Sequence, residues 1–354
     1  MASHRIRAVD LFCGAGGLTH GLRSAGIDVT LGVDVDPACA YPLTANNDTS
    51  FDGRSVVALS GEDMLKAWGD ADVTLLAGCA PCQPFSTYSQ SWSSPEDERW
   101  DLLSHFARLV RESAPDLVTM ENVPKLKKVD VFDRFIEGLK RGGYHVSFQV
   151  IKCSEFGIPQ KRQRLVLLAS KYGPISFVEP TTPQGCELTV RSAIGELEVI
   201  GAGKQSAKDP LHQSANLSAL NMKRMKFSTP GGSWRDWPAK LRADCHLKTT
   251  GKSYPSVYGR MSWDEPSPTI TTQYFAFGSG RFGHPDQDRA LSLREGSLLQ
   301  SFPADYKFVP PGQPIFKATI GRLIGNAVPV KLGEAIGRSL VIHVEKYPSE
   351  KHAA

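Results

Sequence analysis

One stretch of the 354-residue sequence places a cysteine where it could react. Residues 78–86 read GCAPCQPFS, and Cys82 lies between Pro81 and Pro84. Each proline fixes φ and removes a backbone donor, so the cysteine sits on a stiff loop. The apolar residues 73–77 predict a buried strand before this loop, and α/β sheets bind ligands at the carboxyl ends of their strands. A thiol held there is a candidate nucleophile.

Two other interpretations of Cys82 stay open at this point. It could be an ordinary buried cysteine, or Cys79 and Cys82, spaced C-x-x-C, could form a redox pair or half of a zinc site. The chain has seven cysteines without regular spacing. An odd number without regular spacing indicates reduced thiols in an intracellular protein.

Three charged residues could act on a substrate near the cysteine. Residues 117–120 predict a strand that ends at Glu121, and a carboxyl group in a partly dry cleft can hold or donate a proton near neutral pH. Arg162 and Arg164 lead into a strand predicted at residues 165–169, where alternation places both on one face. Guanidinium groups suit a phosphate, a carboxylate or a base carbonyl. Taken singly, each of these side chains could equally be a surface charge or a helix cap.

The N-terminal strand, turn and helix predict a site for a nucleoside-type cofactor. Residues 6–12 predict a strand, residues 13–17 contain three glycines, and residues 18–25 predict a helix. Such a turn brings backbone N–H groups close to a ligand. The dinucleotide fingerprint would need a glycine at position 19, where Thr19 stands. This departure speaks against an NAD-dependent oxidoreductase.

Acidic residues follow the next two predicted strands. Residues 30–35 predict the second strand, and Asp34 at its end could accept hydrogen bonds from ribose hydroxyls, while Asp36 could cap the following helix. Residues 55–59 predict a third strand, and Asp63 follows it. This alternation of strands and helices predicts an α/β fold with a doubly wound, mainly parallel sheet.

The composition changes near residue 180 and predicts a second domain. Beyond this point Pro, Gly, Thr and Ser become frequent and the alternation of strands and helices stops. We expect residues 1–180 plus 320–354 to form the catalytic and cofactor-binding domain. Residues 181–319 then form a smaller, irregular, β-rich domain, with one strand at residues 268–272.

The smaller domain contains a strongly basic segment. Residues 201–262 carry eleven Lys and Arg against three Asp and Glu, a net charge of +8 in a chain whose total is +4. Such a concentration suggests a polyanionic partner, although charge alone would favour an ordinary solvated basic face. Trp234, Trp237, Tyr254 and Tyr258 are interleaved with these charges. They could contact phosphates and bases, or equally form the core of the small domain.

These stretches, in this order, resemble the cytosine-C5 DNA methyltransferases, the family of bacterial modification enzymes. The resemblance runs from the first strand to the last helix and so covers nearly the whole chain. The family also has a variable target-recognition segment, and the basic residues 201–262 lie in that place. The matching stretches are residues 10–17, 78–86, 120–124, 157–164, 294–303 and 325–329.

The resemblance implies that the cofactor is S-adenosylmethionine, bound by the fold of the methyltransferases that use it. Phe12 would stack on the adenine, Asp34 would hold the ribose, and Asp63 would bind the adenine amino group. Several glycines would let the backbone approach. The residues it assigns to the cofactor are Phe12, Gly14, Gly16, Gly17, Asp34, Asp63, Leu102, Asn326 and Ala327.

The resemblance also assigns the catalytic and DNA-binding residues. Cys82 would be the nucleophile, and Glu121 and Arg164 would grip the target cytosine with support from Arg162. The basic segment offers four side chains that could read a guanine or hold a phosphate, and two residues belong to the family's mobile catalytic loop. The DNA-binding candidates are Ser86, Arg99, Arg235, Lys240, Arg242 and Arg260.

The expected function is therefore that of a DNA (cytosine-5-)-methyltransferase that flips its target base out of double-stranded DNA. A tRNA cytosine-5 methyltransferase and a non-catalytic DNA-binding regulator are the alternatives. We expect a cytoplasmic monomer of bacterial or phage origin that acts on nucleoid DNA, with neither a metal nor a membrane partner. A cognate restriction endonuclease would not be a stable partner.

Overall fold

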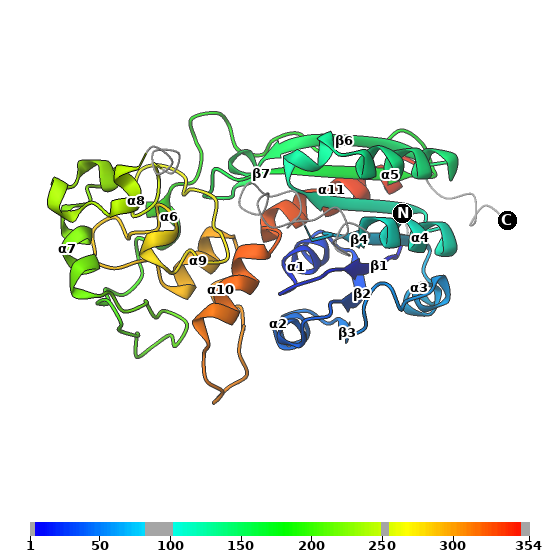
Figure 1. Ribbon diagram of the computed structural model, residues 1–354. Helices are drawn as coiled ribbons and strands as arrows, with labels where there is room; N and C mark the ends of the chain where they lie inside the picture. The colour runs from blue at the N-terminus through cyan, green and yellow to red at the C-terminus, as the bar shows by residue number, and fades with distance from the viewer. Residues whose placement is uncertain (1–3, 82–101, 249–254, 348–354) are drawn as a thin grey trace. The chain divides into compact units, whose positions relative to one another are not determined.

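The computed structural model describes residues 4–81, 102–248 and 255–347 (Figure 1). Within this part of the chain no helix is both long and apolar enough to cross a membrane. The expected domains, residues 1–180 plus 320–354 and residues 181–319, stay a prediction. Internal contacts divide the chain into two compact units, of residues 1–156, 163–180 and 328–354, and of residues 157–162 and 181–327.

The first unit is built on a seven-stranded mixed sheet with the order β3-β2-β1-β4-β5-β7-β6. The pairs from β3 to β5 are parallel, whereas β7 runs antiparallel to both of its neighbours. The strands β1, β4 and β5 are almost wholly buried, as apolar runs in a covered sheet should be. The strands are β1 (Ile6–Leu11), β2 (Asp28–Val33), β3 (Ser50–Asp52), β4 (Val73–Gly78), β5 (Leu117–Asn122), β6 (His145–Lys152) and β7 (Gln163–Ser170).

Helices pack on the sheet in two groups. The first group is a row in which α3 packs on α4 and α4 on α5, and the second contains α1 packed on α11 (Figure 1). A Cβ atom on Gly21 of α1 would lie 2.4 Å from the Val330 carbonyl oxygen, so only glycine allows this close approach. The helices are α1 (Gly17–Ser24), α2 (Ala40–Asn46), α3 (Gly61–Trp68), α4 (Leu102–Ser113), α5 (Asp130–Arg141) and α11 (Val330–Lys346).

The predicted α/β sheet is confirmed, but its third strand was placed wrongly. β3 is Ser50–Asp52, whereas residues 55–59 contain a turn in which Ala58 N donates to Ser55 O at 2.9 Å. Val56 and Leu59 of this turn are buried in the core. The apolar residues within 55–59, which had suggested a strand, are therefore explained by the burial of a turn.

The second unit has no β-strand among its described residues, so the expectation of a β-rich domain is wrong for them. The strand predicted at residues 268–272 is absent, and Ser267 makes only a single bridge, with Gln160. Pro266 and Pro268 flank this serine, and neither can donate to a ladder. The helices of this unit are α6 (Val190–Ile194), α7 (Ala219–Phe227), α8 (Asp244–Leu247), α9 (Leu293–Leu299) and α10 (Lys317–Asn326).

A buried ion pair and an aromatic cluster hold the second unit together. Glu295 of α9 accepts two hydrogen bonds from Arg289, at 2.7 and 2.8 Å, and both side chains are fully buried. Burial alone would raise the pKa of Glu295, but Arg289 outweighs it and lowers the pKa to about 2. Trp234 and Trp237 are buried together in a small core. Of the two roles that the sequence left open for the aromatic residues of the basic segment, these two tryptophans have the one in the domain core.

Asp10 is a buried carboxyl group near the end of β1. Its Oδ2 accepts a hydrogen bond from Thr19 Oγ1 at 2.7 Å, and the side chain is fully buried. Burial raises the pKa of Asp10 from 3.8 to about 7, assisted by the charge of Asp34 and opposed by the Thr19 bond. Ionisation of Asp10 near neutral pH should therefore work against the fold.

We predict that Asp10→Asn weakens the pH dependence of stability. The pKa of Asp10 is raised on folding, so its contribution is fully present below about pH 4 and is lost as the pH rises through about 7. Asparagine keeps an acceptor for Thr19 and does not ionise. In urea unfolding between pH 5 and pH 8, the free energy of unfolding of the variant should therefore rise relative to that of the parent as the pH rises. A difference that stays constant across this range would contradict the prediction.

Candidate functional site

The turn after β4 leads toward Cys82 and is held by the two neighbouring strands. Cys79 N donates to Leu11 O at the end of β1, at 3.2 Å. Asn122, the last residue of β5, is buried and donates from Nδ2 to Ala80 O at 3.0 Å. Cys82 itself lies outside the described residues, as do Ser86 and Arg99.

Glu121 and Arg164, which the sequence singled out separately, form an ion pair. Glu121 stands opposite Val166 in the antiparallel register of β5 and β7, and Arg164, two residues earlier, shares that face. Arg164 Nε lies 2.8 Å from Glu121 Oε1, with side-chain exposures of 12% and 2%. Arg164 also donates from Nη1 to the Gln163 carbonyl oxygen at 2.8 Å. A carboxyl group and a guanidinium thus share one largely buried position at the carboxyl end of β5.

A third group, which the sequence analysis missed, completes this cluster. Cys79 Sγ donates to Glu121 Oε2 at 2.8 Å, so the carboxyl group is held by the thiol on one oxygen and by Arg164 on the other. The C-x-x-C spacing had drawn attention to Cys79 only as a redox or zinc residue. Its position just after β4, beside the end of β5, is the signal that could have indicated this contact. Within the described residues no group of three or more His, Cys, Asp or Glu side chains could hold a metal ion.

The sequence analysis predicted that Arg162 and Arg164 lie on one face of a strand, and this prediction is wrong. β7 begins at Gln163, and the buried Arg162 precedes it. Its guanidinium donates to the carbonyl oxygens of Ile270 at 3.0 Å and Gly325 at 3.4 Å. Alternation applies only within a strand, and this side chain instead anchors backbone of the second unit.

The glycine turn after β1 and the end of β2 form a second cluster. Asp34 accepts hydrogen bonds from Gly14 N on Oδ2 at 3.0 Å and from Asp36 N on Oδ1 at 2.9 Å. Burial is the largest influence on Asp34 and raises its pKa. Phe12, half-buried against the core, has φ of +60°, and Gly14 has +54°. Non-glycine residues seldom adopt this left-handed backbone, and they do so mostly at functional sites.

The geometry of this cluster suits a nucleoside. A Cβ atom on Gly14 would meet no atom of the described residues within 4 Å, so they leave space open beside Gly14. Gly16, with φ of +83°, is the N-cap of α1, and Gly17 is the first residue of that helix. A half-buried carboxylate can accept hydrogen bonds from hydroxyl groups, as a ribose would supply.

The remaining cofactor candidates lie in three other places. Asp63 belongs to the capping box of α3, where Ser60 N and Ser60 Oγ donate to Oδ2, and Arg54 binds its Oδ1 at 3.0 Å. These donors lower the pKa of Asp63 to about 2, with the Ser60 backbone bond as the largest cause. Leu102 is half-buried against the core of the first unit. In the second unit, Asn326 ends α10 and Ala327 is its C-cap.

The four basic candidates for DNA contact differ in exposure. Arg235 and Lys240 are exposed, whereas Arg242 is half-buried and donates to the carbonyl oxygens of Trp237 and Arg235. Arg260 is buried, pairs with Asp288 at 2.7 Å and donates to several backbone carbonyls. This arrangement corrects the sequence interpretation of Arg260, because a guanidinium committed to the core cannot also read a base. The total charge of a segment does not reveal which side chains it buries.

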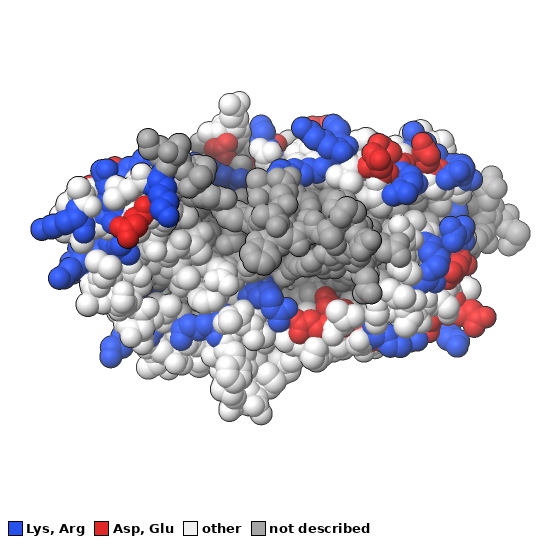
Figure 2. Space-filling view, in the orientation of Figure 1, with Lys and Arg blue, Asp and Glu red and all other residues white. Residues whose placement is uncertain are grey.

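The surface of the second unit is rich in positive charge on the face that Figure 2 shows. Lys and Arg side chains predominate around α7 and α8, whereas over the first unit the two signs are interspersed (Figure 2). A local excess of one sign raises the concentration of a polyanion at that surface. This distribution agrees with the net charge of residues 201–262.

Comparison with known proteins places these features in one family. Residues 6–341 match the family model of C-5 cytosine-specific DNA methylases. The Type II methylase M.HgiDII of Herpetosiphon aurantiacus is 48% identical over 336 residues, which are 94% of each chain. The Type II methyltransferase M.PspPI of Psychrobacter sp. strain TA137 is 31% identical over 98% of this chain and 82% of its own.

Solved structures show the same fold. A candidate DNA modification methyltransferase encoded in an E. coli prophage has a TM-score of 0.74 at 22% identity, over 96% of this chain and 99% of its own. The Entamoeba histolytica methyltransferase EhMeth has a TM-score of 0.66 at 14% identity, over 96% and 99%. The family match spans most of the sequence and agrees with the expected activity, S-adenosylmethionine being the cofactor that this kind of methyltransferase uses. The chain belongs to the C-5 cytosine-specific DNA methylase family and is a DNA (cytosine-5-)-methyltransferase.

Proposed function

We propose that the chain methylates C5 of one cytosine within a specific site of duplex DNA, with Cys82 as nucleophile and with Glu121 and Arg164 holding the base. The observation that carries this proposal is the buried Glu121–Arg164 pair, which lies beside the turn that leads to Cys82. A carboxyl group and a guanidinium side by side match the adjacent N3 and O2 positions on the edge of cytosine.

The residue types suit the reaction. C5 of cytosine is a weak nucleophile, and attack of the Cys82 thiolate on C6 moves electron density toward C5. A proton shared by Glu121 with N3, and a hydrogen bond from Arg164 to O2, stabilise the ring while it carries the sulfur. C5 then accepts the methyl group, a base removes the C5 proton, and Cys82 leaves as thiolate.

The cluster at the ends of β1 and β2 fits the proposed cofactor, S-adenosylmethionine, which supplies the methyl group when bound. Asp34 would accept hydrogen bonds from the ribose, and Phe12 would cover the adenine beside the glycine turn. Leu102 of the first unit, and Asn326 and Ala327 of the second unit, stay candidates that the sequence resemblance alone proposes for the cofactor. The proposed contact between Asp63 and the adenine amino group is the least supported, because Ser60 and Arg54 already engage this carboxylate.

The basic surface of the second unit would hold the DNA as a target-recognition domain. The exposed Arg235 and Lys240 are our candidates for contact with phosphates or bases, and Arg242 would support the turn that carries Arg235. Ser86 and Arg99 would belong to the catalytic loop. Extrusion of the cytosine costs a few kcal/mol, which these contacts would offset.

The relatives suggest a biological setting. M.HgiDII and M.PspPI are named Type II enzymes, and we propose that this chain also acts within a Type II restriction-modification system or as a separate modification enzyme. We propose that it acts as a monomer. A cognate endonuclease would then share the recognition sequence without binding the methyltransferase.

We predict that duplex DNA containing 5-fluorocytosine traps the enzyme as a covalent adduct when S-adenosylmethionine is present. Fluorine at C5 cannot leave as a proton does, so Cys82 remains bonded to C6. The adduct should survive denaturation and should not form with Cys82→Ser. Mapping the trapped fragments gives the recognition site. Absence of an adduct on DNA, together with adduct formation on equally substituted tRNA, would contradict the proposal and favour the tRNA alternative.

We predict that Cys79→Ala slows the reaction without weakening substrate binding. Loss of the thiol removes one of the two groups that hold the Glu121 carboxyl group, and a hydrogen bond to a charged group contributes about 1.5 kcal/mol or more, so kcat should fall about tenfold. KM for DNA and for S-adenosylmethionine should not change. Steady-state methylation of a duplex that contains the mapped site measures both.

Two further variants show whether a lower kcat in Cys79→Ala comes from the lost hydrogen bond. Cys79→Ser keeps a hydrogen-bond donor and should restore most of kcat, whereas Glu121→Gln should reduce kcat by about a hundredfold or more. Equal losses in Cys79→Ala and Cys79→Ser, accompanied by lower stability, would show that the thiol acts only in packing. An unchanged kcat in Cys79→Ala would show that Cys79 has no role in positioning Glu121 for the reaction.

A further inference from the structure

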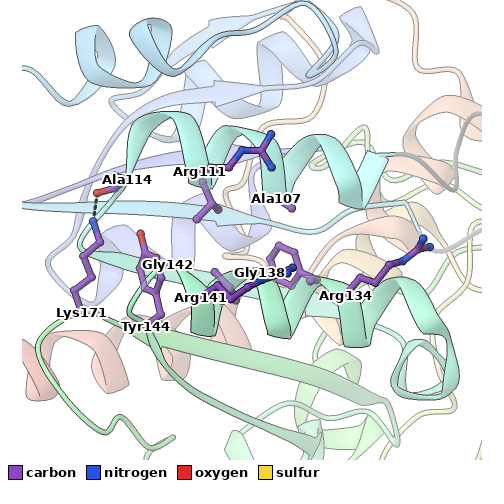
Figure 3. A pocket seen from close by; sticks show the side chains of 12 residues that line it. Ala107, Arg111, Ala114, Arg134, Gly138, Arg141, Gly142, Tyr144 and Lys171 are labelled. Atoms are coloured by element: carbon purple, nitrogen blue, oxygen red, sulfur yellow. Dashed lines mark hydrogen bonds between the residues drawn. The ribbon is translucent and has the colours of Figure 1, made fainter.

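A cavity of about 440 Å³ lies between α4 and α5 of the first unit (Figure 3). One end of it is at Ala114 and Lys171, where Lys171 Nζ donates to the Ala114 carbonyl oxygen. Ala114 follows α4 and leads into the start of β5, while Glu121 stands at the other end of that strand. The cavity is therefore at the opposite edge of the sheet from the Glu121 cluster, and nothing in the proposed reaction uses it.

A glycine in the middle of α5 keeps this cavity open. Gly138 lines it, and a Cβ atom at this position would meet no atom within 4 Å in the part of the chain that the structure describes. Glycine in a helix interior costs about 1 kcal/mol relative to alanine. At Gly21 a close helix contact explains the glycine, but at Gly138 no contact does. On α4, Ala107 contributes a similarly small side chain to the opposite wall (Figure 3).

The floor of the cavity is apolar and partly aromatic. Phe135 and Leu139 of α5 are buried, as is Tyr144, which follows the helix. Tyr144 uses its hydroxyl to donate to the Pro115 carbonyl oxygen at 2.5 Å, so the polar end of the ring is already engaged. These side chains are almost fully buried, and Lys171 Nζ lies over the Tyr144 ring, 5.3 Å from its centroid, so they give the cavity a small apolar floor.

The rim of the cavity is positive. Arg111, Arg134 and Arg141 are exposed, and none makes a hydrogen bond or an ion pair with any residue that the structure describes. None of the described residues that line the cavity is acidic. Arg134, Gly138 and Arg141 share one face of α5 by their spacing, so two guanidinium groups flank the open position.

The helix dipole explains only part of this charge. Cations in the last turn of a helix are favourable, and Arg111 and Arg141 are so placed. Arg134 is the fifth residue of α5 and lies beyond its first turn, so the dipole does not account for a cation there. Its position at the cavity would suit an anionic ligand.

We propose that this cavity binds a small organic phosphate with a flat apolar group, of the size and chemistry of a purine nucleoside monophosphate. The volume lies within the range of small-molecule sites, about 300–1,000 Å³. The apolar floor takes an edge of the flat group, and an arginine of the rim takes the phosphate in the forked geometry that guanidinium favours. The proposal does not depend on the assignments made for the catalytic residues.

The test uses the full chain, saturated with S-adenosylhomocysteine so that the proposed cofactor site is filled. Isothermal titration with guanosine 5′-monophosphate should show one site per chain. Guanosine and inorganic phosphate, titrated separately, should each bind at least tenfold more weakly. Equal binding by phosphate alone, displacement of the nucleotide by a non-specific DNA duplex, or no binding at millimolar concentration would overturn the proposal.

Three variants locate the binding. Arg134→Gln should weaken the nucleotide about tenfold, because it removes a charge-assisted hydrogen bond. Gly138→Leu should abolish binding by filling the cavity, yet it should unfold at or above the parent's midpoint and retain methylation activity. Lys140→Gln, on α5 but outside the cavity, is the matched control and should bind as the parent does. Unchanged binding in both Arg134→Gln and Gly138→Leu would contradict the assignment.

Discussion

The direction of a single strand determines what this site can do. β7 is antiparallel to β5, so its first residues meet the carboxyl end of β5, and Arg164 reaches Glu121. If β7 ran parallel like the strands from β3 to β5, its beginning would lie at the amino edge of the sheet, more than a strand length from Glu121. The ion pair, and with it the proposed grip on cytosine, depends on this reversal.

The strand order brings the two halves of the proposed site to one edge. β1 and β4 are adjacent in the sheet, and the order of strands reverses between them. Ligands in open α/β sheets bind where the order reverses, because the loops that follow the two strands leave in opposite directions. Here one of these loops is the glycine turn beside Asp34, and the other begins with Cys79. A methyl donor and its acceptor need to meet at such a place.

Much of the first unit could be predicted from the sequence, for identifiable reasons. β4 and β5 are short apolar runs in a covered sheet, and α5 has a regular apolar stripe, so local pattern sufficed for all three. Glu121 and Arg164 could be selected by residue type and by their positions at predicted strand ends. The pairing of Glu121 with Arg164 could not be predicted, because the direction of β7 is a property of the whole sheet.

The remaining differences arise where burial, which is not visible in residue type, decides the role of a charge. Arg162 and Arg260 look like ligand-binding arginines in the sequence, yet each is buried and satisfies backbone carbonyls. Cys79 looked like half of a C-x-x-C pair and instead donates to Glu121. The second unit has few periodic segments, so its short helices and isolated bridges left little pattern to interpret.

A crystal structure of the enzyme bound covalently to a DNA duplex with a 5-fluorocytosine at its target position would show whether Glu121 and Arg164 hold the base. The account predicts a flipped base with N3 within hydrogen-bond distance of the Glu121 carboxyl group and O2 within hydrogen-bond distance of the Arg164 guanidinium. A flipped base whose N3 and O2 contact other groups, with Glu121 and Arg164 turned away from it, would contradict the account.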